Sequence, residues 1–327
     1  MEERVISVEN LKTYFYADGD MSKAVDDVSF SVKRGEIVSI VGESGCGKSV
    51  TSLSIMKLIS EPGRIVDGRI IFNGKDILKM NVKDIQNLRG KDIAMIFQEP
   101  MTSLNPVFTI GKQMIETILE HSLLSKKEAY EKAVNLIKKV GLPRAEEIMD
   151  SYPHQLSGGM LQRIMIAIAL SCEPKLLIAD EPTTALDVTI QAQILDILRQ
   201  IKSEEGMSIL FITHDLGVVA EMADYVIVMY AGKIIEEAPV VELFQNPKHP
   251  YTKGLLKSKP IIGKRKERLY SIKGQVPDLS ELTDSCYFSD RCESCMEVCR
   301  RKQPVYTSVS ENHKVACWLY GQGGTDE

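Results

Sequence analysis

A glycine-rich loop at residues 42–49 constrains the fold of this chain more than any other feature. It reads Gly42-Glu43-Ser44-Gly45-Cys46-Gly47-Lys48-Ser49. The loop follows a short apolar run at residues 36–41 and precedes a helical segment, so its context is strand, loop, helix. Glycines let backbone N–H groups surround phosphate oxygens, and the start of the helix adds its dipole. A chance glycine turn is a weak alternative, because every fixed position of the phosphate-loop pattern is filled.

The polar residues that end this loop have the chemistry of a nucleotide site. Lys48 is expected to neutralise the β- and γ-phosphates, and Ser49 is expected to bind Mg²⁺. Cys46 occupies a free position of the pattern, and we interpret it as a small filler with no redox role.

A second apolar strand, at residues 176–179, is followed by two carboxylates. Asp180 suits an acidic contact to Mg²⁺, and Glu181 suits a general base that polarises a water beside the γ-phosphate. Alone, such a pair would be interpreted as solvated residues at a strand end. In a chain with a phosphate loop, the catalytic interpretation is favoured.

Three more polar residues follow strands or lie in turns. Gln98 ends the run at 93–97, Asp187 follows residues 183–186, and His214 closes the run at 209–213. Each is a weak signal alone, since a histidine at a strand end is more often structural. Their shared placement is more informative, because open α/β sheets bind ligands at strand ends.

A second pair of glycines lies at the head of an apolar helix. Ser157, Gly158 and Gly159 offer a hydroxyl and backbone N–H groups to an anion. Beside a phosphate loop, this feature predicts that a nucleotide is gripped from two sides by two copies of a domain.

The organisation of the chain predicts an α/β fold. Strands are expected at 4–8, 28–32, 176–179, 209–212 and 226–229, with a helix at 190–201 between two of them, which favours a largely parallel sheet. Residues 99–156 have a helical texture, and a helix around residues 129–140 is expected to end at Gly141. The strand and helix pattern thins after about residue 238, which predicts a domain boundary there.

Composition limits the function. The net charge of −5 and pI of about 5.7 argue against nucleic-acid binding by bulk electrostatics. The N-terminus lacks the features of a signal peptide, and no apolar run is long enough to span a bilayer. Any membrane role is therefore expected to come through partners.

Five of the seven cysteines lie between residues 286 and 317. In a chain without an export signal, clustered cysteines favour metal ligation over disulfides. Four thiolates suit zinc or an iron–sulfur cluster, and the lack of two C-x2-C pairs favours the cluster. Free thiols are the alternative.

Taken together, the ordered motifs resemble those of an ATP-binding-cassette (ABC) ATPase, over residues 1–237. The resemblance implies a P-loop NTPase core with a parallel sheet, an antiparallel β subdomain, and a helical signature subdomain at about 99–160. It implies that Gln98 senses a transmembrane partner and touches Mg²⁺ or water, that His214 contacts the γ-phosphate, and that Asp187 couples two sites across a dimer. Phe15 is the best match for the aromatic that stacks on adenine, with Tyr14 and Tyr16 as rivals.

The implied catalytic set is Glu181, His214 and Gln98, with Ser49 and Gln98 on Mg²⁺. The implied nucleotide contacts are Phe15, Gly42, Glu43, Ser44, Gly45, Cys46, Gly47, Lys48, Ser49, Val50, Gln98, Asp180, Ser157, Gly158, Gly159 and Asp187.

Residues 238–327 resemble the extension of oligopeptide and dipeptide importer ATPases, on the string at 246–256 and the cysteines. Met160, where most cassettes have Gln, is common in peptide importers. The family spacing implies a [4Fe–4S] cluster on Cys286, Cys292, Cys299 and Cys317, with zinc as the second choice and Cys295 left over. We interpret His249 as a capping or packing residue.

This resemblance implies an ATPase subunit that energises import of dipeptides or oligopeptides from the cytoplasmic face of the membrane. Its implied partners are a second ATPase, identical or distinct, two permease subunits and an extracytoplasmic peptide-binding protein. Nickel chelates remain an alternative cargo. A soluble cassette ATPase acting on nucleic acid or ribosomes is the rival class, but the interval at 49–156 shows no sustained heptads, and the chain has one cassette.

Overall fold

Two units make up the computed structural model, which describes residues 3–17, 19–184, 186–258 and 270–321. The first unit is built from Met1–Val5, Val32–Glu36 and Lys79–Ile212. The second is built from Ile6–Ser31, Ile37–Leu78 and Thr213–Glu327. Each unit is described separately below.

The first unit contains three parallel strands, in the order β6 (Ile93–Ile96), β7 (Leu176–Asp180) and β8 (Ser208–Ile212). Ile178 of β7 is in register with Met95 of β6 and Leu210 of β8. Every residue of β7 and β8 is buried. Strands covered on both faces are continuous apolar runs, which is why the sequence revealed them and why the predicted parallel sheet is confirmed.

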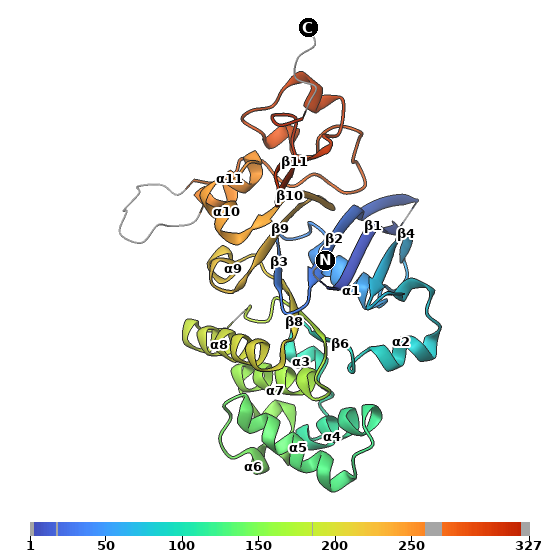
Figure 1. The fold of residues 1–327 in the computed structure, drawn as a ribbon, viewed down its shortest axis with the longest axis vertical. Helices are drawn as coiled ribbons and strands as arrows, with labels where there is room; N and C mark the ends of the chain where they lie inside the picture. Colours follow the sequence, from blue (N-terminus) through green and yellow to red (C-terminus); the bar gives the residue numbers. More distant parts are fainter. Residues whose placement is uncertain (1–2, 18, 185, 259–269, 322–327) are drawn as a thin grey trace. The chain divides into compact units, whose positions relative to one another are not determined.

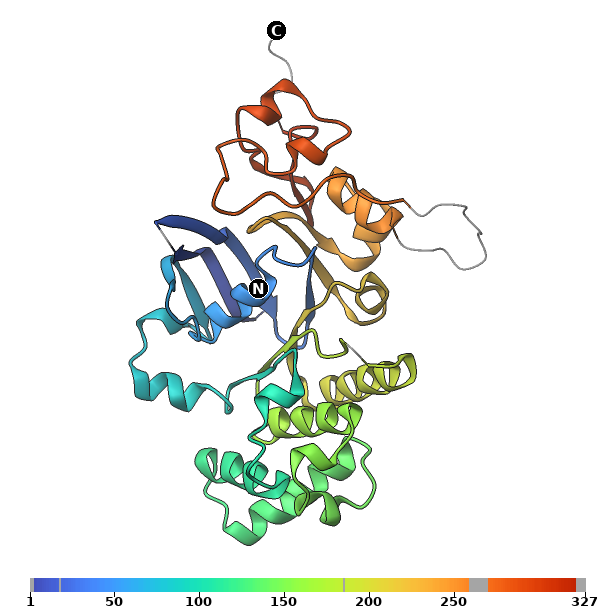
Figure 2. The ribbon, with the colours of Figure 1, turned by 180° about the vertical axis from the view of Figure 1, so that it is seen from behind.

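Helices form most of the rest of the first unit. The four that surround the signature are α4 (Ile110–His121), α5 (Lys126–Lys139), α6 (Ala145–Met149) and α7 (Gly158–Leu170), and α5 contacts the other three (Figures 1 and 2). Helix α5 begins at a capping box of Ser125 and Glu128 and ends before Gly141, whose φ of 74° is left-handed. The predicted end at Gly141 is confirmed.

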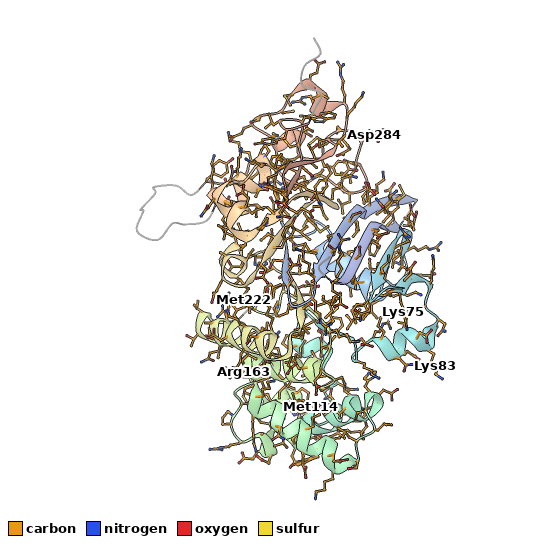
Figure 3. The ribbon with its side chains drawn as sticks, in the orientation of Figure 1. Lys75, Lys83, Met114, Arg163, Met222 and Asp284 are labelled. Carbon is orange, nitrogen blue, oxygen red and sulfur yellow. The ribbon has the colours of Figure 1, made fainter. Side chains whose placement is uncertain are left out.

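Side-chain packing and hydrogen bonds stabilise this group of helices. Met114 on α4 is fully buried, and Arg163 on α7 donates from Nη1 to the carbonyl oxygen of Gly141 at 3.1 Å (Figure 3). The remaining elements of this unit are α2 (Val82–Leu88), α3 (Pro100–Ser103), the 3-10 turn η2 (Pro153–Gln155) and α8 (Val188–Glu205).

The second unit holds the antiparallel sheet that was expected as a subdomain. Its order is β2-β1-β4-β5, formed by β1 (Arg4–Ala17), β2 (Asp20–Lys33), β4 (Gly63–Phe72) and β5 (Lys75–Asp76), with η1 (Ile77–Lys79) after it. The predicted strands at 4–8 and 28–32 were therefore too short. Polar residues that alternate with buried ones extend β1 onward to Ala17 and extend β2 back to Asp20.

A further run of strands in the second unit carries the glycine-rich loop. Strand β3 (Ile37–Val41) pairs in parallel with β9 (Tyr225–Tyr230), and β9 pairs with antiparallel β10 (Lys233–Pro239). Helix α1 (Lys48–Ile55) follows β3, and α9 (Leu216–Met222) precedes β9.

The C-terminal region continues this sheet. Strand β10 pairs with β12 (His313–Ala316), and β12 pairs with β11 (Tyr306–Ser310). The other elements are α10 (Val240–Gln245), α11 (Pro250–Lys257), η3 (Ser289–Arg291) and η4 (Glu297–Arg300).

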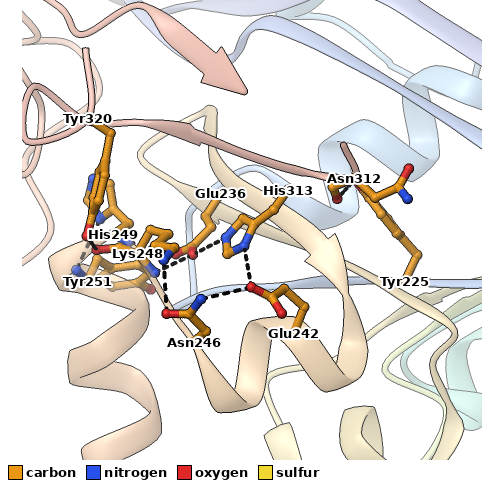
Figure 4. Close-up of polar contacts among 10 residues, drawn as sticks. All are labelled: Tyr225, Glu236, Glu242, Asn246, Lys248, His249, Tyr251, Asn312, His313 and Tyr320. Carbon is orange, nitrogen blue, oxygen red and sulfur yellow. Dashed lines mark hydrogen bonds and ion pairs between the residues drawn. The ribbon is translucent and has the colours of Figure 1, made fainter. Parts of the chain in front are cut away.

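A fully buried carboxylate anchors this region (Figure 4). Oxygens of Glu236 on β10 accept from the backbone N–H groups of Lys248 at 2.6 Å and His249 at 2.9 Å, and one lies 2.8 Å from Nε2 of His313 on β12. Buried charge is tolerated when it is fully hydrogen-bonded. No helix among the described residues is long and apolar enough to cross a membrane.

Candidate functional site

The loop between β3 and α1 is shaped by backbone contacts that only glycine allows. A Cβ on Gly42 would lie 2.3 Å from the carbonyl oxygen of Met229, and one on Gly47 would lie 2.2 Å from that of Ala24. Gly47 also has a left-handed φ of 99°. At Gly45 no atom lies within 4 Å of the Cβ position, so the middle of the loop is open.

A buried lysine donates hydrogen bonds to the backbone of the loop. Lys48 is the first residue of α1 and is 5% exposed. Its Nζ donates to the carbonyl oxygens of Gly42 at 2.9 Å and Glu43 at 3.0 Å. Burial raises the pKa of the Cys46 thiol, so this fully buried side chain is a neutral filler. Ser49 and Val50 follow in the first turn of α1 and are half-buried.

In the first unit, the end of β7 presents the two carboxylates. Asp180 is 4% exposed at the end of the strand. Glu181 has a left-handed φ of 48°, a conformation that costs about 1–3 kcal/mol in a non-glycine residue and is concentrated at functional sites.

The Glu181 carboxylate is held by two donors. Its Oε2 accepts from Oγ1 of Thr184 at 2.8 Å and from Nε2 of Gln98 at 3.2 Å. The structure thus brings Gln98 and Glu181 together, as their placement at strand ends predicted. It adds Thr184, which the sequence analysis missed; a threonine three residues after the glutamate was the available signal.

The signature residues lie at a helix N-terminus. Ser157 is the N-cap of α7, and its Oγ accepts from the N–H of Met160 at 3.4 Å. Ser157 and Gly158 are exposed, and a Cβ on Gly159 would lie 3.0 Å from Ile190. Exposed N–H groups at the start of a 13-residue helix can bind an anion.

Asp187 caps a second helix in the same unit. Its Oδ1 accepts from the N–H of Ile190 at 3.0 Å at the start of α8, and its side chain is exposed. The structure therefore gives Asp187 a capping role at the start of α8.

His214 and Phe15 belong to the second unit. His214 is exposed and follows β8, and its neighbour Asp215 caps α9. The Phe15 ring is half-buried and covers Gly63, where a Cβ would lie 2.6 Å from it. Of its rivals, Tyr14 donates to Asp26 at 2.9 Å and Tyr16 is 43% exposed.

The prediction of a metal on the C-terminal cysteines was wrong. The described residues contain no group of three or more His, Cys, Asp or Glu side chains that could hold a metal ion, so neither the [4Fe–4S] cluster nor zinc is supported. All seven cysteines are free. Burial raises the pKa of Cys286 to about 12 and that of Cys317 to about 11, so both side chains are neutral thiols in this structure.

An aromatic core supports this region. Phe288 is 4% exposed, and its ring lies 5.3 Å from that of Tyr230 and 5.5 Å from that of Tyr251. Cys286 and Cys292 pack against the same core. The sequence did not reveal this core, because Tyr230 and Tyr251 lie far from Phe288 in the chain.

His249 has the capping role that was predicted. It is the N-cap of α11, and its Nδ1 accepts from the N–H of Tyr251 at 3.1 Å. The side chain is 2% exposed, and burial lowers its pKa to about 3.

Each unit, taken by itself, offers groups with suitable chemistry. The loop of the second unit provides open backbone at Gly45 and a buried lysine, which suit phosphates. The hydroxyl of Ser49 in the second unit and the carboxylate of Asp180 in the first are oxygen groups of the kind that Mg²⁺ prefers.

Comparisons with known proteins agree with this chemistry. Residues 25–184 match the family described as ABC transporter, and residues 235–299 match the oligopeptide/dipeptide transporter C-terminal region. The chain is 52% identical over 324 residues to the oligopeptide transport ATP-binding protein AppD of Bacillus subtilis (strain 168), with 99% of each chain covered. It is 46% identical over 313 residues to the dipeptide transport ATP-binding protein DppD of Escherichia coli (strain K12), with 96% of each covered.

A solved structure also resembles it: the dimeric post-hydrolysis state of the ATP-binding cassette MJ0796 bound to ADP and Pi. The TM-score is 0.66 at 26% identity, covering 72% of this chain and 98% of that one. The fold and the loop thus define an ATP-binding-cassette ATPase. More narrowly, the chain belongs to the oligopeptide/dipeptide transporter branch of the ABC transporter family.

Proposed function

We propose that this chain is the ATP-hydrolysing subunit that energises import of dipeptides or oligopeptides through an ABC transporter. The observation that carries the proposal is the likeness to peptide-transport subunits along the whole chain, including residues 235–299 beyond the cassette. A cassette acting on nucleic acid or ribosomes is not favoured, and neither is a nickel-chelate importer.

Residues 42–50 would hold the phosphates, with Lys48 neutralising them and Phe15 stacking on adenine. The exposed residues Ser44 and Gly45 of the loop and the buried Lys48 support this role. Bound Mg²⁺ would offset phosphate charge, held by Ser49, Gln98 and Asp180. Residues 1–237 would act as the cassette, with the helical part at about 99–160, and residues 238–327 would act as its extension.

Glu181 would be the general base. Thr184 and Gln98 both donate to Oε2, which orients the carboxylate that would accept a proton from water. The left-handed backbone of Glu181 fixes the direction of the side chain. His214 would contact the γ-phosphate and sense its loss.

Ser157, Gly158 and Gly159 would grip the γ-phosphate bound by a second ATPase subunit, and Asp187 would couple the two sites. ATP would then close a dimer that pulls on two permease subunits, while an extracytoplasmic peptide-binding protein delivers the cargo. In that assembly the chain is peripheral, on the cytoplasmic face of the membrane.

The test is the substitution Glu181→Gln, which keeps the shape and the hydrogen-bond acceptor but removes the base. Hydrolysis by the assembled transporter should fall at least about 100-fold, while binding of ATP is retained. Glu173→Gln is the matched control, because Glu173 is an exposed carboxylate that pairs with Lys132. Hydrolysis by Glu181→Gln at the wild-type rate would show that the base is another residue.

A further inference from the structure

An arginine of the C-terminal region reaches the glycine-rich loop. Arg291 ends η3, and its Nη1 donates to both carboxylate oxygens of Glu43, at 3.2 and 3.1 Å. The Arg291 side chain is only 6% exposed, and that of Glu43 is 29% exposed. The pair therefore joins residues 248 positions apart in the chain, and its arginine is almost fully shielded from solvent.

The same arginine is itself held on several sides. Its Nε donates to the carbonyl oxygen of Lys273 at 3.0 Å, and Nη1 also lies 3.3 Å from the hydroxyl of Tyr230. Its guanidinium lies 5.7 Å from the Tyr230 ring and 5.9 Å from the Phe288 ring. An arginine fixed in this way loses little entropy when it binds a carboxylate.

A tyrosine holds the backbone of the same loop residue. The hydroxyl of Tyr251 on α11 accepts from the N–H of Glu43 at 2.8 Å, and the Tyr251 ring is fully buried. The carbonyl oxygen of Glu43 accepts from Nζ of Lys48. Glu43 is thus fixed at its N–H and carboxylate by the C-terminal region, and its carbonyl contacts the loop lysine.

Position 43 is a free position of the phosphate-loop pattern, so phosphate binding does not require a carboxylate there. A carboxylate in a loop that receives a polyanion repels it unless a cation is paired with it. We propose that Arg291 is a positioning residue for ATP binding: it neutralises Glu43 and holds the start of the phosphate loop in its binding conformation. The inference rests on the proposed role of the loop.

The experiment measures the affinity of the full-length chain for a fluorescent ATP analogue. Arg291→Ala should raise the Kd about tenfold, which corresponds to about 1.4 kcal/mol, because Glu43 then repels the phosphates. Adding Glu43→Gln to that variant should restore the Kd to within about twofold of the wild type, since the uncompensated charge is gone. Arg291→Lys should have a smaller effect than Arg291→Ala.

Arg300→Ala is the matched control. Arg300 lies in the same region with a 66% exposed side chain, 3.8 Å from Asp290, and its loss should leave the Kd unchanged. A purely structural role for Arg291 would lower the stability of the C-terminal region without changing the Kd, and that result would overturn the inference. If Arg291→Ala does not fold, Arg291→Gln keeps a donor while losing the charge, and an unchanged Kd in that variant would also overturn it.

Lys48→Ala separates this inference from the proposed function. If Lys48→Ala abolishes binding while Arg291→Ala binds like the wild type, only the role of Arg291 is wrong. If Lys48→Ala itself binds ATP normally, the loop is not the nucleotide site and both ideas fail.

Discussion

His249 makes the stability of the C-terminal region depend on pH. Its imidazole is buried as the N-cap of α11 and accepts from the N–H of Tyr251 through Nδ1. Protonation would remove this acceptor and place a charge beside the Phe288 ring, 5.6 Å away. Burial, and to a lesser degree the positive charge of Lys253, lowers the pKa of His249 to about 3.

The size of the effect follows from the pKa difference between the folded and unfolded states. The unfolded chain binds the proton near pH 6.5, whereas the folded chain binds it only near pH 3. Stability is therefore full above pH 6.5 and falls as the pH drops from there towards 3. At pH 5 the loss is about 2 kcal/mol, from a difference of about 1.5 pH units at 1.36 kcal/mol each.

Trp318 provides the assay, since it is the only tryptophan of the chain and donates to the carbonyl oxygen of Lys302 in the C-terminal region. Denaturant unfolding followed by its fluorescence at pH 7.5 and 5.0 gives the free energy of unfolding. His249→Asn keeps a capping acceptor that does not titrate, so the variant should lose about 2 kcal/mol less than the wild type over this interval. Equal losses in the two proteins would refute the reasoning.

Three substitutions test the geometry elsewhere. Asp187→Ala removes the cap of α8 and should lower the free energy of unfolding by about 1 kcal/mol, measured by thermal denaturation. Asp187→Asn, which keeps a capping side chain, is the control. An unchanged free energy of unfolding in Asp187→Ala would contradict the capping role. Gly47→Ala should weaken binding of a fluorescent ATP analogue far more than Gly45→Ala. A Cβ at position 47 would meet the Ala24 carbonyl, whereas a Cβ at position 45 would meet no atom within 4 Å. Equal affinities of the two variants would contradict this reasoning. Phe288→Ala should destabilise the C-terminal region by about 3–5 kcal/mol, seen in Trp318 fluorescence, and an unchanged midpoint would mean that the aromatic core is not its support.

Local features of the sequence predicted the parts of the site that depend on local chemistry. Gly45 and Gly47 provide the left-handed backbone of the loop, with φ of 79° and 99°, and Ser157 caps the helix that it begins. Buried strands such as β7 are visible as continuous apolar runs. These features could be predicted because each is specified by residues close together in the chain.

Long-range pairing is what the sequence did not reveal. Glu236 and Glu237 would be interpreted as surface charges, yet they are buried because His313 and Lys314 on β12 pair with them. Likewise, the aromatic partners of Phe288 and the contact of Arg291 with Glu43 come from distant segments. The cysteine spacing suggested a metal, but spacing alone does not show whether side chains converge or how buried they are.

ATP-dependent uptake of labelled peptide tests the central claim most directly. Proteoliposomes would contain the permease subunits, the peptide-binding protein, this chain and the second ATPase of the assembly where there is one. The account predicts that a labelled dipeptide or oligopeptide accumulates with ATP and the wild-type chain, and that Glu181→Gln abolishes accumulation. Peptide uptake at the wild-type rate with Glu181→Gln, or uptake that does not depend on ATP, would contradict the account.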